Sequence, residues 1–228
     1  MDVTGQYIDP GAGMIRLLPC HPQRRDVEIL STWMLRVASA NVNSVRELCR
    51  WLGSDEVLTL DLMGYNNPLV GSIAEAVGVA KKVVIESLPS SFYGLYGKST
   101  SYVLSRWTSF GRILGGTSSP KFGNQYCPAC LREFGHDQLR WTFAIYTCCL
   151  GHMCFLRDRC PHCGRVFRGA DRLFNSYIAN AAKQLQHCTY CGGSVVNHEL
   201  SEIADEKTIK VTCLVETGPS SPTLPTWP

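Results

Sequence analysis

Residues 126–164 read YCPACLREFGHDQLRWTFAIYTCCLGHMCFLRDRCPHCG, and this stretch, with HCTYCGG at 187–193, governs how the chain folds. Both stretches contain close pairs of candidate metal ligands with two residues between the members of each pair: Cys127/Cys130, Cys149/His152, Cys160/Cys163 and Cys188/Cys191. This spacing lets one tight turn present two side chains, and two such turns complete a tetrahedral site. Sulfur-rich tetrahedral sets that include a histidine favour zinc. The sequence therefore predicts two structural zinc ions.

The order of the pairs leaves two arrangements open. In the sequential arrangement, which we favour as the simpler one, the first and second pairs form one site and the third and fourth form the other. In the interleaved arrangement, the first pair joins the third and the second joins the fourth. Cys148 precedes Cys149 directly, but only Cys149 makes the C-x-x-H spacing with His152.

Eight ligands saturate two tetrahedral ions, and this favours a structural role over a catalytic one. A catalytic zinc keeps an open position for water or substrate. The signatures H-E-x-x-H and H-x-E are both absent from the sequence. A redox C-x-x-C requires a βαβ setting that the pattern does not indicate. We expect no enzyme activity and no catalytic residues, with a zinc hydrolase or nuclease as the minor alternative.

The composition is that of a soluble globular protein. The chain has 228 residues and a net charge of +3, which permits contact with nucleic acid without arguing for it. Nine of the twelve cysteines lie between Cys127 and Cys191, as expected for metal ligands in a reducing compartment. No apolar run reaches the roughly 20 residues of a membrane span, and the N-terminus lacks the pattern of a secretory signal. We expect a cytoplasmic protein with no membrane partner.

Helical periodicity dominates the first half of the chain. Apolar residues recur at helical spacing between Val27 and Leu52, interrupted at 41–43. Asn43 or Ser44 could cap the second of these helices, and Gly53 could end it. Asn67 followed by Pro68 predicts the start of another helix. Residues 73–88, IAEAVGVAKKVVIESL, then fit a helix-turn-helix with Gly78 at the turn.

The second helix of this helix-turn-helix has poor chemistry for reading DNA bases. Lys81 and Lys82 could hold phosphates, whereas Ile85 and Glu86 suit neither bases nor phosphates. A packed helical hairpin, or a protein-binding surface of the same shape, stays open as an alternative. Arg106 and Arg112, in a segment at 102–114 that could form a helix, are further candidates for contact with nucleic acid or a partner.

The predicted fold is mainly α with small irregular or β zinc-binding elements, in which a helix-turn-helix region precedes two tandem structural zinc fingers. We expect a helical domain at 14–95, a connecting segment at 96–125 that could contain a helix, and a tandem zinc-finger domain at 126–200. A helix near 171–186 should interrupt the zinc fingers. A C-terminal tail at 201–228 should be partly disordered.

The order of these features resembles the TniQ family of transposon proteins. The resemblance rests on LSTWMLRVASANVNSVRELCRWLG (30–53), on the stretch at 126–164 with Trp141 between CPACL and C-x-x-H, and on HCTYCGG. It spans about residues 15–200. One departure is Asp26-Val27-Glu28, where family members more usually have Gly-Glu-Ser.

The resemblance implies a non-enzymatic adaptor for target selection in DNA integration. Such an adaptor links a target-recognition module to a TnsC-type AAA+ ATPase by protein–protein interaction. The chain ends soon after the second zinc site, which favours the short type of CRISPR-associated transposons. In that type, the resemblance implies that the target-recognition module is a CRISPR effector with guide RNA, and that target DNA lies within the complex. Family behaviour allows a monomer or a homodimer. The alternative is an autonomous, sequence-specific DNA-binding regulator, whose affinity should fall steeply with salt.

Overall fold

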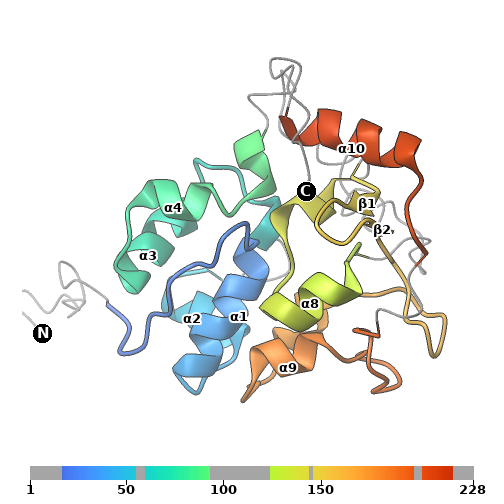
Figure 1. Cartoon of the computed structure of the whole chain (residues 1–228). Helices are drawn as coiled ribbons and strands as arrows, with labels where there is room; N and C mark the ends of the chain where they lie inside the picture. The colour runs from blue at the N-terminus through green and yellow to red at the C-terminus, as the bar shows by residue number, and fades with distance from the viewer. Residues whose placement is uncertain (1–16, 55–59, 93–123, 144–145, 198–201, 218–228) are drawn as a thin grey trace, which may run out of the picture.

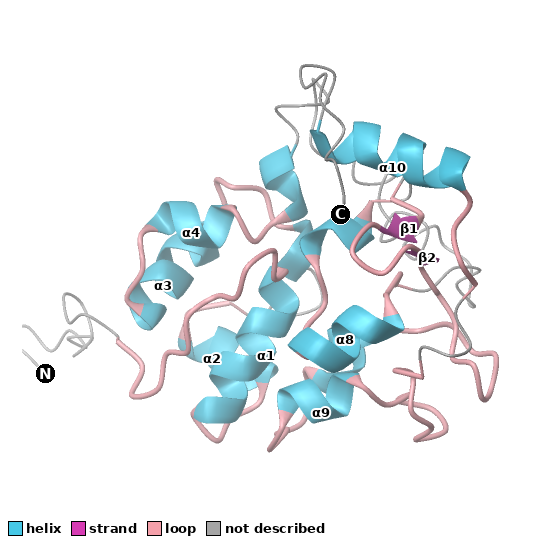
Figure 2. Ribbon diagram, in the orientation of Figure 1, coloured by secondary structure: helices cyan, strands magenta, loops and turns pink. Residues whose placement is uncertain are grey.

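A computed structural model of the chain describes residues 17–54, 60–92, 124–143, 146–197 and 202–217. Helices α1 to α4 lie on one side of the molecule, and α8, α9 and a short hairpin β1–β2 lie on the other, with α10 beside the hairpin (Figures 1 and 2). This arrangement confirms the mainly helical fold class with a small strand pair. None of the helices in these ranges is long and apolar enough to cross a membrane.

Helix α1 (Leu30–Ala40) is the central helix of the structure. Eight of its eleven residues are buried, and Trp33 and Met34 are completely so. Helix α2 (Val45–Trp51) follows after a short loop, and the Ser44 side chain caps it by accepting a hydrogen bond from the Glu47 N–H at 3.2 Å. This confirms Ser44 over Asn43 as the cap. A 3-10 turn, η1 (Leu60–Leu62), then leads towards the next helices.

The predicted helix-turn-helix segment forms two packed helices, α3 (Pro68–Val77) and α4 (Lys81–Ile85). Asn67 caps α3 through the Leu69 N–H, as expected. Gly78 ends α3 with a φ of +67°, a conformation that costs glycine little. The arrangement is compatible with a helix-turn-helix. Its second helix, however, has only five residues before the chain turns into η2 (Pro89–Phe92).

The second half is built from short elements. They are α8 (Pro128–Phe134), η3 (Leu139–Thr142), β1 (Cys148–Cys149), β2 (Cys154–Phe155), η4 (Gly169–Leu173) and α9 (Ala181–Leu185). The helix expected near 171–186 is therefore wrong in extent, because η4 and α9 are separate. Asn180, which lies between them, caps α9 through the Lys183 N–H. The segment at 102–114 lies outside the described residues.

Helix α10 (Glu206–Thr217) occupies part of the segment expected to be a tail. It packs against β1 through a small apolar cluster of Cys148, Leu150, Ala204 and Cys213. The Cys148 Sγ lies 3.2 Å from the Thr212 Oγ1, and Thr212 is fully buried. Polar residues alternate with apolar ones along this helix, so composition alone did not reveal it.

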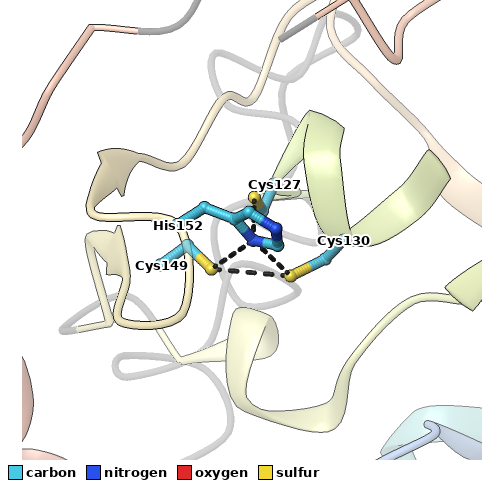
Figure 3. Close-up of side chains that lie close together, drawn as sticks. All are labelled: Cys127, Cys130, Cys149 and His152. Carbon is cyan, nitrogen blue, oxygen red and sulfur yellow. Dashed lines mark hydrogen bonds between the residues drawn. The ribbon is translucent and has the colours of Figure 1, made fainter. Parts of the chain in front are cut away.

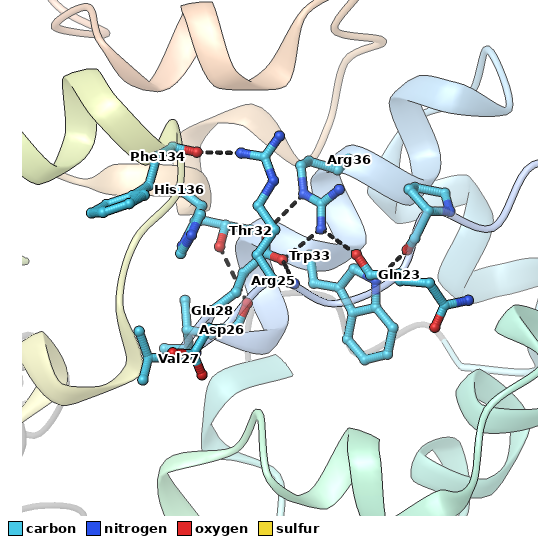
Figure 4. A network of polar contacts seen from close by, with 12 residues as sticks. Gln23, Arg25, Asp26, Val27, Glu28, Thr32, Trp33, Arg36, Phe134 and His136 are labelled. Carbon is cyan, nitrogen blue, oxygen red and sulfur yellow. Dashed lines mark hydrogen bonds and ion pairs between the residues drawn. The ribbon is translucent and has the colours of Figure 1, made fainter.

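A strap of backbone at 25–29 joins the two halves. The Ile29 N–H donates to the Asp137 carbonyl at 3.2 Å, and the Leu139 N–H donates to the Val27 carbonyl at 2.7 Å. Within the strap, the fully buried Glu28 carboxylate accepts two hydrogen bonds from Arg36 of α1, at 2.6 and 2.8 Å (Figure 4). Buried residues from both halves form one hydrophobic cluster around these contacts.

Replacing Arg36 with alanine should strongly destabilise the protein, because it leaves the Glu28 carboxylate buried without its counter-charge. Breaking a buried ion pair costs about 3–5 kcal/mol. The free energy of unfolding can be measured by guanidinium denaturation of the metal-loaded chain. Lys210→Ala, at the exposed Glu206–Lys210 pair, is the matched control and should leave the midpoint in place. An unchanged midpoint for Arg36→Ala would show that the strap contributes little.

Candidate metal centres

The eight predicted ligands converge in two clusters. The first consists of Cys127, Cys130, Cys149 and His152, and the second of Cys160, Cys163, Cys188 and Cys191. Within each cluster the potential ligand atoms all lie within 4.8 Å of one another. The geometry therefore combines neighbouring pairs along the chain and does not interleave them.

The first cluster joins helix α8 to the β1–β2 hairpin. Cys127 is the residue before α8 and Cys130 lies in its first turn, while Pro128 starts the helix without needing an N–H partner. Cys149 ends β1, and His152 lies in the turn that leads to β2. Figure 3 shows the His152 ring directed at the sulfurs of the three cysteines.

The separations in the first cluster fit a tetrahedral zinc site. Zinc–sulfur bonds of about 2.3 Å place two sulfur ligands about 3.8 Å apart, and a sulfur and a nitrogen ligand about 3.5 Å apart. The Cys130 and Cys149 sulfurs are separated by 3.5 Å. The His152 Nδ1 lies 3.7, 3.2 and 3.5 Å from the sulfurs of Cys127, Cys130 and Cys149. The four donors thus surround a space of the right size for one such ion.

His152 is oriented by a carboxylate that the sequence analysis did not identify. Its Nε2, the ring nitrogen that faces away from the sulfurs, lies 3.1 Å from the Glu133 Oε1. A carboxylate on the outer nitrogen of a ligating histidine fixes the ring and raises its basicity. Glu133 lies three residues after Cys130 on α8, and this spacing on one helix face could have identified it.

Adjacent cysteines in the hairpin have different surroundings. Cys149 faces the first cluster, whereas Cys148 faces α10. This follows from the strand geometry, in which successive side chains point to opposite faces. Cys154 is a fourth cysteine beside the first cluster, with its sulfur 3.8 Å from that of Cys127.

The second cluster is built from two similar turns, CPHCG at 160–164 and CTYCG at 188–192. In each turn a backbone N–H points at the first sulfur, from His162 to Cys160 at 3.4 Å and from Tyr190 to Cys188 at 3.5 Å. The closing glycines have φ values of +67° and +70°. Sulfurs from opposite turns lie 3.7 and 3.8 Å apart, which again fits a tetrahedral zinc.

Each cluster contains a cysteine that ionises more easily than usual. Hydrogen bonds from Cys130 and Cys149 lower the pKa of Cys127 to about 7. Burial raises the pKa of Cys188, but hydrogen bonds from the backbone N–H groups of Cys191 and Tyr190, together with those from the Cys160 and Cys163 thiols, more than offset this and lower it to about 7.

Other cysteines of the clusters are shifted in the opposite direction: hydrogen bonds with Cys127 and Cys149 raise the pKa of Cys130, and burial raises the pKa of Cys160 to about 12. Because thiolates are the species that bind metal, an incoming ion must displace protons from these two thiols. Cys49, which lies outside both clusters, likewise has its pKa raised to about 12 by burial.

The other predicted contact residues lie apart from the clusters. Lys81 and Lys82 are exposed on α4, and the Lys82 ammonium is 3.8 Å from the Glu86 carboxylate. Arg106 and Arg112 lie outside the described residues.

Comparison with known proteins gives one family. The sequence model of the TniQ family matches residues 19–156, which is more than half of the chain. The match includes helices α1 to α4 and all four residues of the first cluster, and it ends before the second cluster. No curated protein matches the chain.

The two adjacent cysteines give a sharp test of the first cluster. Cys149→Ser should reduce the metal content from two ions per chain to about one, because it removes a ligand. Cys148→Ser should retain both ions. Elemental analysis of the purified variants measures this, and equal metal loss in both would contradict the ligand assignment.

Glu133→Gln should weaken metal binding at the first cluster without abolishing it. Losing an outer-shell partner of this kind costs about tenfold or more in metal affinity. Competition with a chromophoric chelator reports the affinity, and Glu75→Gln, at an exposed carboxylate on α3, serves as the control. Equal affinities in the two variants would show that Glu133 does not support His152.

Proposed function

Because the chain belongs to the TniQ family of transposition proteins, we propose that it acts as a non-enzymatic adaptor that selects the target for DNA transposition. The observation that carries this proposal is the family match over residues 19–156. The adaptor would link a target-recognition module, an RNA-guided CRISPR effector with its guide RNA, to a TnsC-type AAA+ ATPase in the cytoplasm. Target DNA would lie within the same complex.

In this proposal each cluster holds one structural zinc ion. Three thiolates and an imidazole, or four thiolates, fill all positions of a tetrahedral ion. Such an ion has no position left for water or substrate, so its contribution is to hold the surrounding loops in place. Zinc binding to sites of this kind contributes on the order of 10 kcal/mol to folding.

The connection between the halves supports an adaptor role. Helices α1 to α4 present one surface, and the second half of the chain, which contains the two clusters and α10, presents another. The strap and the shared hydrophobic cluster fix these surfaces relative to each other. Two partners that bind to opposite sides would therefore be held at a defined separation and orientation.

The surface of α4 favours a protein partner over DNA readout. Glu86 forms ion pairs of 3.8 Å with both Lys82 and Arg24, so a carboxylate lies among the basic groups of this face. A phosphate would meet this negative charge, and Ile85 offers no hydrogen bond to a base. These features count against the autonomous DNA-binding regulator.

Assembly experiments separate the adaptor from the regulator. The purified chain should co-elute with a TnsC-type ATPase in the presence of ATP, or with the guide-RNA effector, when all come from one transposon. On its own it should show no site-specific affinity for duplex DNA in gel shifts at physiological salt, and Lys81→Ala/Lys82→Ala should not change this. Nanomolar, site-specific binding by the isolated chain, lost in that double variant, would overturn the adaptor proposal in favour of the regulator.

A further inference from the structure

The segment at 159–197, which contains the second cluster, is basic in sequence, and it follows directly after the acidic Asp158. Residues 159–197 contain five arginines and lysines and one acidic residue, a net charge of +4, whereas the whole chain carries only +3. The remainder of the chain is therefore slightly acidic. A zinc ion with four thiolates adds about −2 to this segment, which leaves it about +2. The overall charge of the chain conceals this asymmetry.

An arginine and a tyrosine are stacked on the surface of this segment. Arg165 follows the first turn of the second cluster, and its guanidinium carbon lies 4.9 Å from the centre of the Tyr190 ring on the second turn. Arg165 is exposed, and 36% of Tyr190 is accessible to solvent. The pair thus presents flat π-surface beside positive charge, a combination suited to stacking on nucleic-acid bases.

A second arginine lies on the same turn. Arg159 pairs with Val166 across the base of the turn, and its guanidinium donates to the Gly164 carbonyl at 3.1 Å. Its side chain is 52% exposed and forms an ion pair of 3.9 Å with the neighbouring Asp158 carboxylate. Arg159 therefore places another exposed guanidinium on the turn that carries Arg165.

The two turns are held together before any ligand binds. The His162 ring of the first turn lies over Gly193, where an added Cβ would come within 2.6 Å of it. Its Nε2 is 2.8 Å from the Ser194 carbonyl oxygen. This contact and the four sulfurs fix the position of Tyr190 relative to Arg165, so little ordering cost would accompany binding.

We propose that this surface, formed by Arg159, Arg165 and Tyr190, binds an unpaired stretch of nucleic acid. Bases stack on Tyr190 and Arg165, and Arg159 contacts the phosphates. Duplex DNA fits less well, because zinc modules that read a duplex insert a helix into the major groove. The only α-helix among the described residues of this segment is α9, which has five residues and packs against α1. The inference goes beyond the proposed function, since the surface lies outside the family match.

Fluorescence anisotropy with the full, metal-loaded chain tests the proposal. The probes are labelled oligo-uridine RNA, oligo-thymidine DNA and a duplex, each about 12 units long, because single-strand sites span about 4–16 nucleotides. At least one single strand should bind about tenfold more tightly than the duplex, and its affinity should fall as salt rises. The comparison of RNA with DNA identifies which of the two is the ligand.

Variants assign the binding to this surface. Tyr190→Ala and Arg165→Ala should each weaken single-strand binding about tenfold, the scale of one lost stacking contact. Tyr190→Phe should retain it, and Lys81→Ala/Lys82→Ala, which removes two charges from the other half, should change it less than twofold. Unchanged metal content and circular dichroism show that the variants are folded.

Three results would overturn the proposal. They are no measurable single-strand binding at low salt, duplex binding as tight as single-strand binding, and full affinity in folded Tyr190→Ala and Arg165→Ala. ATPase assembly is scored separately, so failure of this inference is distinguishable from failure of the adaptor proposal.

Discussion

Burial of the cysteine sulfurs is the constraint on which the rest of the structure depends. Cys127, Cys130, Cys149 and Cys188 are at least 95% buried and belong to the same hydrophobic cluster as Trp33. A thiolate in such surroundings is costly unless a cation compensates it. The cysteines of the first cluster and two of the second, Cys160 and Cys188, are therefore part of the core, whereas Cys163 and Cys191 are exposed. These buried clusters explain how two-residue strands and five-residue helices hold their places in this half.

The same core explains why the two halves are joined so firmly. The backbone of the strap at 25–29 forms hydrogen bonds with residues 137–139 of the second half. In this position Glu28 is buried, and Arg36 of α1 compensates its charge. The strap contains Asp26-Val27-Glu28, the stretch in which this chain departs from the more usual family sequence. Glu28 is the acidic residue of this stretch that becomes fully buried, and Arg36 is its ion-pair partner.

Local chemistry made part of this structure predictable from sequence. Ligand spacing indicated both clusters, and Ser44 and Asn67 marked helix starts, because each depends on neighbours within a few residues. The separation of η4 from α9 and the docking of α10 depend on distant contacts, such as that between Cys148 and Thr212. The Arg165–Tyr190 pair depends on how two turns far apart in sequence meet, which spacing within one segment does not specify. Glu133 was within reach of sequence reasoning, because it lies three residues after Cys130 on the same helix.

Strand β1 has a consequence that reaches beyond the hairpin. Cys148 contacts helix α10, and its neighbour Cys149 is a member of the first cluster. The helix and the cluster are therefore connected through one two-residue strand. A molecule that binds α10 and shifts β1 must also alter the affinity of the first cluster for its ion. By thermodynamic reciprocity, occupancy of that cluster must alter binding at α10 by the same factor. The affinity of a partner for α10 would then depend on the concentration of available metal.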